Sequence, residues 1–357
     1  MHKLAPADCW DENTYYVPSD EPQRERYSPE PRTRDSRERA VRMARHMDMC
    51  TLGVGKGGVF PFGHGGPGEI QPVVIERNPE FKILEYEGGS RRKIHYNPHS
   101  IHYYHFLLKE KRDPDSIELP DMRDPRRFQD VEEDCRLFKA GDTVTTGSIQ
   151  GFFSGIHNSF MDFEDTMVNL LLEPEYMHRV TRVLAEMSLD AVDMYMDRGV
   201  EIIDVCDDLG NAAGLLLSPE LFRTFFLPWY ERLVDRVHQR GGYVHLHSHG
   251  NIAPVLPDFV SIGVDIINPF DWGENPDLPG LVRRFARDVV FCGGCESALY
   301  RFPDEEVEAI IRRACGLAEP AEGRYVLMVS GIIDALSIER WNRWRETIRR
   351  AREELAV

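Results

Sequence analysis

The stretch Tyr243-Val-His-Leu-His-Ser-His-Gly-Asn251 decides the fold that we expect for this chain. Its histidines, His245, His247 and His249, alternate with apolar or small residues. Neighbouring side chains on a strand point to opposite faces, so the apolar residues would pack against one layer and the three imidazoles would share the other face. Imidazoles at the C-terminal end of a strand are suited to metal binding, general base catalysis or holding an anion.

Short apolar runs alternate with longer amphipathic runs from about residue 142 onward. The predicted strands are 143–149, 201–207, 243–248, 264–269, 289–294 and 324–329. The predicted helices are 163–198, 219–240, 251–262, 278–287, 304–318 and 337–355. Repeated β–α units imply a parallel sheet, and six units with room for two more upstream favour a (β/α)8 TIM barrel over an open sheet.

The N-terminal part of the chain differs in character from the rest. Residues 1–35 are rich in Pro, Arg, Glu and Ser without sustained periodicity, and they predict an extended arm before a barrel domain of residues 36–357. Ser36 is a plausible N-cap of a helix that runs to about His46. The segment from Phe81 to Tyr96, with glycines at 88 and 89, predicts a β-hairpin inserted before the barrel units.

Composition excludes several classes of protein. The 357 residues carry a formal net charge of -17, which argues against non-specific binding to nucleic acid and against an anionic membrane surface. No apolar run is long enough to cross a bilayer. The seven cysteines are odd in number and scattered, which is typical of reduced thiols in a cytoplasmic protein.

Chemistry in a TIM barrel sits where strands end and the following loops begin. Polar residues follow several of the predicted strands at that point, and the candidates are Asp204, Asp208, His245, His247, His249, Asn268, Asp271, Glu296 and Asp334. An inward-facing carboxylate is costly unless it is paired, hydrogen-bonded or bound to a metal. Two of the carboxylates could instead have a purely structural role, Asp208 as an N-cap or loop residue and Glu296 as a helix cap.

Histidines and carboxylates around one barrel mouth allow two kinds of chemistry. A divalent metal held by His247, His249 and a carboxylate, either Asp208 or Glu296, would keep an open catalytic position if the ion were zinc. Without a metal, the same residues could work as a His/Asp acid–base pair.

Several motifs, in their order and spacing, resemble the uroporphyrinogen decarboxylase superfamily. They are Asp207-Asp-Leu-Gly-Asn211, Leu217-Ser-Pro-Glu-Leu-Phe222, Leu227-Pro-Trp-Tyr230, His247-Ser-His-Gly-Asn251, Gly263-Val-Asp-Ile-Ile-Asn-Pro269 and Phe291-Cys-Gly-Gly294. The resemblance covers the chain from about residue 140 to its end. It implies a TIM barrel and one of two activities: decarboxylation of uroporphyrinogen without a cofactor, or methyl transfer to or from a corrinoid on a partner protein, usually with zinc.

The chain departs from both branches of that superfamily. The decarboxylases carry an arginine-rich motif, R-Q-A-G-R, that holds substrate carboxylates, and this sequence lacks it. The methyltransferases typically carry H-x-C and a later Cys as metal ligands. Here His247 matches the histidine, His249 stands in place of the Cys, and Ser330-Gly-Ile-Ile333 stands near the second. A site richer in nitrogen and oxygen would hold a harder, more Lewis-acidic metal, which fits an ether or amine methyl donor.

We therefore expect a cytoplasmic methyltransferase that moves a methyl group from a small substrate to a corrinoid protein with the help of zinc. His247, His249 and Glu296 would be the metal ligands, and Asp208, His247 and Glu296 the catalytic residues. The expected substrate-binding residues are Asp204, His245, Asn268 and Asp271. The rival is a metal-free decarboxylase that uses Asp208 and the histidines for proton transfer, and a third reading is a non-catalytic binder of a tetrapyrrole or a partner. The resemblance also implies a homodimer.

Overall fold

The computed structural model describes residues 33–47, 49–55, 73–86, 88–96, 99–108, 113–295, 299–328 and 338–355. These residues form two compact units. The first unit contains residues 33–207 and 220–243, and the second contains residues 208–219 and 244–355. Each unit is described by itself.

The first unit contains three parallel strands in the order β1, β6, β7. They span Thr51–Gly53, Val144–Gln150 and Ile202–Cys206. Thr51 pairs with Val144, and Thr146 pairs with Ile202. The side chains of Ile203 and Val205 are fully buried, whereas Asp204 and Cys206, each of which follows one of them, are half-buried, which is the predicted alternation.

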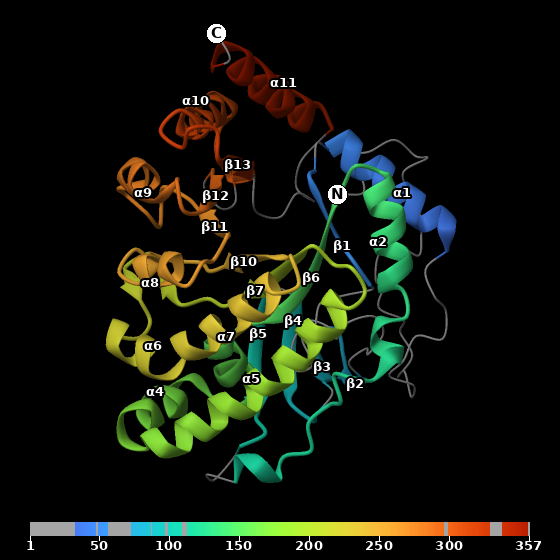
Figure 1. The fold of residues 1–357 in the computed structure, drawn as a ribbon, viewed down its shortest axis with the longest axis vertical. Helices are drawn as coiled ribbons and strands as arrows, with labels where there is room; N and C mark the ends of the chain where they lie inside the picture. Colours follow the sequence, from blue (N-terminus) through green and yellow to red (C-terminus); the bar gives the residue numbers. More distant parts are fainter. Residues whose placement is uncertain are drawn as a thin grey trace. The chain divides into compact units, whose positions relative to one another are not determined.

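Helices follow the strands of the first unit. They are α1 (Arg34–Met47), α2 (Val131–Ala140), α3 (Phe152–Gly155), α4 (Phe163–Leu172), α5 (Pro174–Met196), α6 (Pro219–Phe225) and α7 (Leu227–His238). A π-helical turn, Ile156–Phe160, continues α3. The two long helices α5 and α7 lie side by side (Figure 1).

A separate antiparallel sheet lies within the first unit. Its strands, in spatial order, are β2 (Val73–Arg77), β3 (Phe81–Glu85), β4 (Arg91–Tyr96) and β5 (His99–His105). The pair β3–β4 is the predicted hairpin, and Gly88 and Gly89 both have positive φ in its turn. The insertion is larger than predicted, because β2 and β5 extend the hairpin on both sides.

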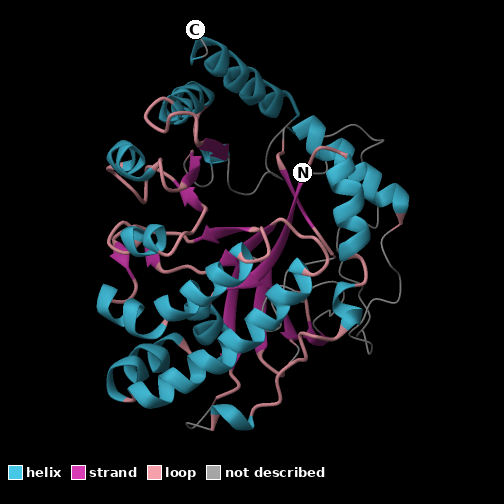
Figure 2. Ribbon diagram, viewed as in Figure 1, coloured by secondary structure: helices cyan, strands magenta, loops and turns pink. Residues whose placement is uncertain are grey.

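The second unit repeats the β–α pattern (Figure 2). Its parallel strands are, in order, β10 (Tyr243–His247), β11 (Ile266–Phe270), β12 (Val290–Gly294) and β13 (Tyr325–Met328). The helices are α8 (Leu256–Ser261), α9 (Leu278–Phe285), α10 (Asp304–Cys315) and α11 (Ile338–Leu355). A short ribbon pairs β8 (Gly210–Asn211) with β9 (Gly214–Leu215). All six strands predicted from residue 142 onward are confirmed, and the repeated β–α units are those of a (β/α)8 TIM-barrel-like fold.

The alternation predicted for the histidine strand is also confirmed. Val244 and Leu246 are 1% and 0% exposed, whereas His245 and His247 are half-buried. The strand ends at His247, so His249 lies in the loop that follows rather than on the strand.

Some sequence-based boundaries were wrong. Helix α1 begins at Arg34, and Thr33 rather than Ser36 caps it, because the Thr33 Oγ1 accepts the Ser36 N–H at 3.1 Å. The helix predicted for 163–198 is two helices that meet before Pro174. The helix predicted for 219–240 is likewise divided, and α2 was not predicted. Glu296, Ser330-Gly-Ile-Ile333 and Asp334 lie outside the described residues, and so does the arm up to residue 32.

No helix among the described residues combines the length and the apolar character that crossing a membrane requires.

Candidate active site

Two histidines and two carboxylates meet in the second unit, where β10 ends. The His247 Nε2 lies 3.8 Å from the Asp208 Oδ1, and the His249 Nδ1 lies 3.3 Å from the Glu274 Oε1. The two imidazole rings face each other edge to face, with centroids 5.0 Å apart. The structure thus brings together three of the predicted site residues, His247, His249 and Asp208.

All four side chains are reachable by a ligand. The exposed fractions are 27% for His247, 38% for His249, 54% for Asp208 and 18% for Glu274. Partial burial weakens the solvent screening between an imidazole and its carboxylate, so Glu274 can influence the protonation of His249.

Glu274 is the residue of this cluster that sequence reasoning missed. It lies in a turn after β11, where its own N–H donates to the Asp271 Oδ1 at 2.9 Å. Its second oxygen accepts the Gly250 N–H at 2.9 Å. The hydrogen bond of the His249 ring to the Glu274 carboxylate raises the pKa of His249 above its ordinary value, against the opposing effect of burial. His249 is thus oriented by a carboxylate that the Gly250 N–H holds, on a residue whose own N–H is bound to Asp271.

Backbone contacts also fix Asp208. Its Oδ1 accepts the His249 N–H at 2.9 Å, so the same oxygen that faces His247 is tied to the loop after β10. Ser248, which is 1% exposed, ties that loop to the residue after Asp208, because its Oγ accepts the Leu209 N–H at 3.0 Å. The Asp208 carboxylate is therefore a loop-anchoring group and a partner of His247 at the same time.

Asn268 lies next to His247 on the neighbouring strand, as their Cα pairing shows. It is 4% exposed, and its amide Nδ2 donates to the Met328 Sδ at 3.2 Å. Its Oδ1 is buried without a hydrogen-bond partner among the described residues. A buried unpaired carbonyl is costly, so this oxygen is suited to accept a hydrogen bond from a ligand.

The other predicted substrate-binding residues have different surroundings. Asp271 is 2% exposed and accepts the Glu274 N–H, so its described contact is within its own turn. His245 is half-buried on β10. Asp204 belongs to the first unit, where it accepts a hydrogen bond from the Ser148 Oγ at 3.3 Å. A role of any of them in substrate binding stays a prediction.

A buried carboxylate of the first unit, Asp207, was also missed from the sequence. Asp207 is fully buried, and it accepts hydrogen bonds from the Phe153 N–H at 3.0 Å, the Ser154 N–H at 2.6 Å and the Tyr230 hydroxyl. Burial raises the pKa of Asp207, and these hydrogen bonds oppose that rise. Asp207 therefore holds the start of α3. The next residue in the chain is Asp208, whose carboxylate accepts the His249 N–H.

The described residues do not complete a metal site. No group of three His, Cys, Asp or Glu side chains in the described part of the chain is arranged to hold a metal ion. His247 and His249 are close enough to serve as two ligands, and a carboxylate bound to the far nitrogen of a ligand histidine is a common arrangement around zinc. Glu296, the predicted third ligand, lies outside the described residues.

Replacing Glu274 with glutamine should lower the pKa of His249 toward its ordinary value. A raised histidine pKa stabilises the fold below the unfolded value of 6.5, and this stabilisation is lost as the pH rises through the folded value. NMR titration of the imidazole protons would measure both variants. Asp208→Asn should give a smaller change, and an unaltered His249 titration in Glu274→Gln would contradict the pairing.

Comparisons with known proteins agree with these motifs and this fold. The family model described as Uroporphyrinogen decarboxylase (URO-D) matches residues 92–350. A uroporphyrinogen decarboxylase of Nocardia farcinica (strain IFM 10152) is 25% identical over 170 residues, which are 48% of this chain and 45% of that protein. The chain thus matches about half the length of this relative.

A solved structure described as a methyltransferase from Methanosarcina mazei is similar with a TM-score of 0.59 and 13% identity. The similarity covers 90% of this chain and 86% of that one. At 13% identity, the similarity shows a shared fold. The match of the family model over most of the chain is the finding that assigns the family, and the chain belongs to the uroporphyrinogen decarboxylase family.

Proposed function

We propose that this protein is a methyltransferase that moves a methyl group from a small ether or amine to a corrinoid carried by a partner protein. The observation that carries the proposal is the pair of adjacent imidazoles, each beside its own carboxylate, at the partly exposed end of β10. Such a pair is suited to protonating a heteroatom that loses its methyl group.

The residues of the chain would supply the proton and hold the donor. When the bond between the methyl carbon and the heteroatom breaks, its electron pair stays on the heteroatom, which then needs a proton. His247 would give that proton to the heteroatom, and the Asp208 carboxylate lies 3.8 Å from its Nε2. His249, fixed by Glu274, would face the same ligand, and the buried Asn268 Oδ1 would accept a hydrogen bond from it.

Two features of the sequence favour this reading over decarboxylation. The chain lacks the R-Q-A-G-R motif that would bind a substrate with many carboxylates. The similar fold of a protein described as a methyltransferase supports the same reading. The alternative is a decarboxylase in which the same histidines protonate the carbon that loses CO2, and the Nocardia farcinica relative supports it.

Zinc held by His247, His249 and Glu296 stays a prediction, and no step of the proposed mechanism depends on it. Bound there, zinc would polarise the leaving heteroatom as a Lewis acid. Metal analysis of the purified wild type and of His247→Ala/His249→Ala tests the prediction, since about one zinc per chain should be lost in the double variant. A cytoplasmic location and a homodimer likewise stay predictions.

The experiment is a methyl-transfer assay with free cob(I)alamin as the acceptor and methyl phenyl ether or trimethylamine as the donor. Formation of methylcobalamin is expected with the wild type and should fall about 100-fold or more in His247→Ala, since general acid catalysis is typically worth that much. His238→Ala, an exposed histidine of the other unit, should leave the rate unchanged. Release of CO2 from uroporphyrinogen without methyl transfer would overturn the proposal and favour the decarboxylase.

A further inference from the structure

The Asn268 amide in the candidate active site is oriented by a sulfur atom. Met328, at the end of β13, accepts a hydrogen bond from the Asn268 Nδ2, which lies 3.2 Å from its Sδ. The Cys292 Sγ lies 3.8 Å from the same sulfur as a second donor. A thioether sulfur accepts hydrogen bonds, weakly, and cannot donate them. Met328 therefore distinguishes between the two ends of the neighbouring amide.

The two ends of an amide side chain have opposite hydrogen-bonding character. Turning the Asn268 amide over would place its Oδ1, an acceptor, against the Met328 Sδ, another acceptor, and would lose the hydrogen bond from Nδ2. The sulfur thus holds the amide with its nitrogen toward Met328 and its oxygen turned away. Asn268 is 4% exposed, and its Oδ1 has no hydrogen-bond partner among the described residues. A buried carbonyl in this state favours a ligand that donates a hydrogen bond.

In the order of the strands, His247 and Met328 lie on opposite sides of Asn268. His247 and Asn268 are Cα partners on the parallel strands β10 and β11, so their side chains share one face of the sheet. The strands β12 and β13 follow on the other side of β11. The donor end of the amide is thus bound on the side of β13, and the acceptor end is the one that can meet a ligand beside His247.

We propose that Met328 is a positioning residue, and that through Asn268 it makes the site select a methylated amine that carries an N–H over a methyl ether. The N–H of such an amine would donate to the Asn268 Oδ1. An ether oxygen would face the same atom as a second acceptor and leave the buried carbonyl unpaired. This selection rests on the proposed function, because the methyl donor has to bind beside His247.

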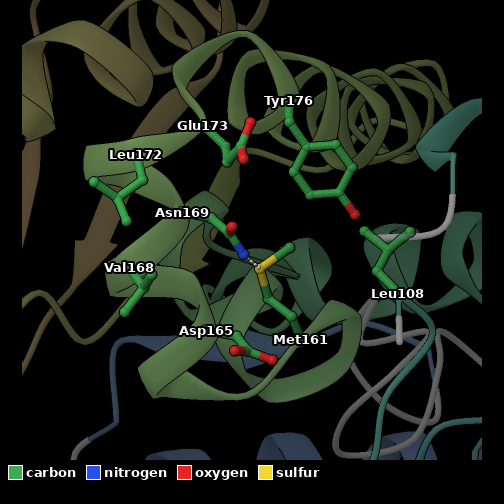
Figure 3. A pocket seen from close by; sticks show the side chains of 8 residues that line it. All are labelled: Leu108, Met161, Asp165, Val168, Asn169, Leu172, Glu173 and Tyr176. Carbon is green, nitrogen blue, oxygen red and sulfur yellow. Dashed lines mark hydrogen bonds between the residues drawn. The ribbon is translucent and has the colours of Figure 1, made fainter. Parts of the chain in front are cut away.

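A second contact between an amide and a thioether, in the first unit, supplies a matched control. The Asn169 Nδ2 donates to the Met161 Sδ at 3.7 Å in the wall of a pocket of about 270 Å³, as the dashed line in Figure 3 shows. Asn169 and Met161 are 7% and 3% exposed, so this amide is nearly as buried as that of Asn268. Met161→Leu removes a sulfur from the same kind of contact and leaves the contact of Asn268 with Met328 in place.

Isothermal titration calorimetry on the full chain tests the selection with two probes of the same shape. N-methylaniline and methyl phenyl ether are both uncharged near neutral pH, and they differ in the group that carries the methyl, an N–H in one and an oxygen in the other. The wild type should bind N-methylaniline about tenfold more tightly, since one hydrogen bond to a buried carbonyl accounts for roughly that factor. Equal affinities, or no binding of N-methylaniline at millimolar concentrations, would overturn the proposal.

Binding is measured here without an acceptor for the methyl group, so the result is separate from the transfer assay. A failed transfer assay with an intact preference for N-methylaniline would reject methyl transfer and leave the role of Met328 standing. Methylcobalamin formation with equal affinities for the two probes would reject the role of Met328 alone.

Variants of the two methionines identify the cause of the preference. Met328→Leu keeps the volume of the side chain and removes the acceptor, so the Asn268 amide can turn its nitrogen toward an ether oxygen. The preference for N-methylaniline should then fall from about tenfold to about twofold or less. A loss of packing alone would weaken the binding of both probes and keep their ratio. Met161→Leu should retain the ratio of the wild type, and Asn268→Ala should bind both probes equally.

An unchanged ratio in Met328→Leu, with the variant folded by circular dichroism, would show that the sulfur does not position the amide. Met328→Ile also lacks the sulfur and provides the same test if Met328→Leu does not fold. A ratio that falls equally in Met161→Leu would mean that the preference responds to any buried methionine, and the role assigned to Met328 would be wrong.

Discussion

Replacing Asp207 with alanine should lower the free energy of unfolding by about 3–5 kcal/mol. The Asp207 side chain is fully buried, and it accepts the Phe153 N–H, the Ser154 N–H and the Tyr230 hydroxyl. Alanine would leave these three buried donors without an acceptor. Each unpaired buried donor costs about 1–3 kcal/mol, and partial entry of water would keep the sum below the full total.

Urea denaturation followed by circular dichroism would measure this loss, and a graded series of variants would identify its cause. Tyr230→Phe removes one of the three donors and leaves the carboxylate with two, so we expect a loss of about 1–2 kcal/mol. The neighbour Asp208 provides the matched control. Its side chain is 54% exposed, and Asp208→Asn should change stability by about 1 kcal/mol or less.

The comparison between the two neighbouring carboxylates is decisive. If Asp207→Ala were as mild as Asp208→Asn, the network around the start of α3 would not stabilise the fold, despite its geometry. If Tyr230→Phe alone caused the whole loss, the two backbone donors would contribute nothing, and the role assigned to Asp207 in holding α3 would be wrong.

The regular part of the fold could be predicted because its residues follow a short period. The strands β7 and β10 alternate buried apolar side chains with half-buried polar ones. This pattern places Asp204 on the less buried face of β7, and His245 and His247 on the less buried face of β10, without knowledge of the rest of the chain. The same alternation along β7 also carries information about Asp207. Continuing the alternation of Ile203 and Val205 puts Asp207 on the buried side, where a carboxylate needs donors.

The loops could not be predicted in this way. Glu274 reaches His249 only because a turn after β11, stabilised by the Asp271 carboxylate and backbone, brings it back toward the end of β10. The contact joins residues 25 positions apart, and nothing in the local periodicity encodes it. The size of the β2–β5 sheet has the same origin, since only its central hairpin carries a turn signal of two glycines.

Replacing Gly250 with alanine should have the other large effect, a loss of about 3 kcal/mol or more in the free energy of unfolding. Gly250 has a φ of +92°, and a Cβ there would lie 2.1 Å from the Gly210 carbonyl carbon and 2.3 Å from the Asn211 nitrogen. These are backbone atoms, so no side chain can rotate away to relieve the contact.

The consequence should extend to the candidate active site. The Asn251 N–H donates to the Asn211 carbonyl at 3.0 Å, and the Gly250 N–H donates to Glu274. Separating these two loops would release Glu274 from the backbone contact that holds it against His249. We therefore expect Gly250→Ala to lower the pKa of His249 in the folded protein as well as its stability, and NMR titration would detect the shift.

Gly241→Ala separates the two contributions to this loss. Gly241 also has a positive φ, +74°, but nothing lies within 4 Å of the position of its Cβ. Its variant should therefore lose only the conformational part, about 1–2 kcal/mol, and leave the His249 titration unchanged. Equal losses in the two variants would mean that the loops at 210–211 and 250–251 move apart at little cost. In that case the close contact of the two loops would not be what positions Glu274, and the turn that begins at Asp271 would have to hold it alone.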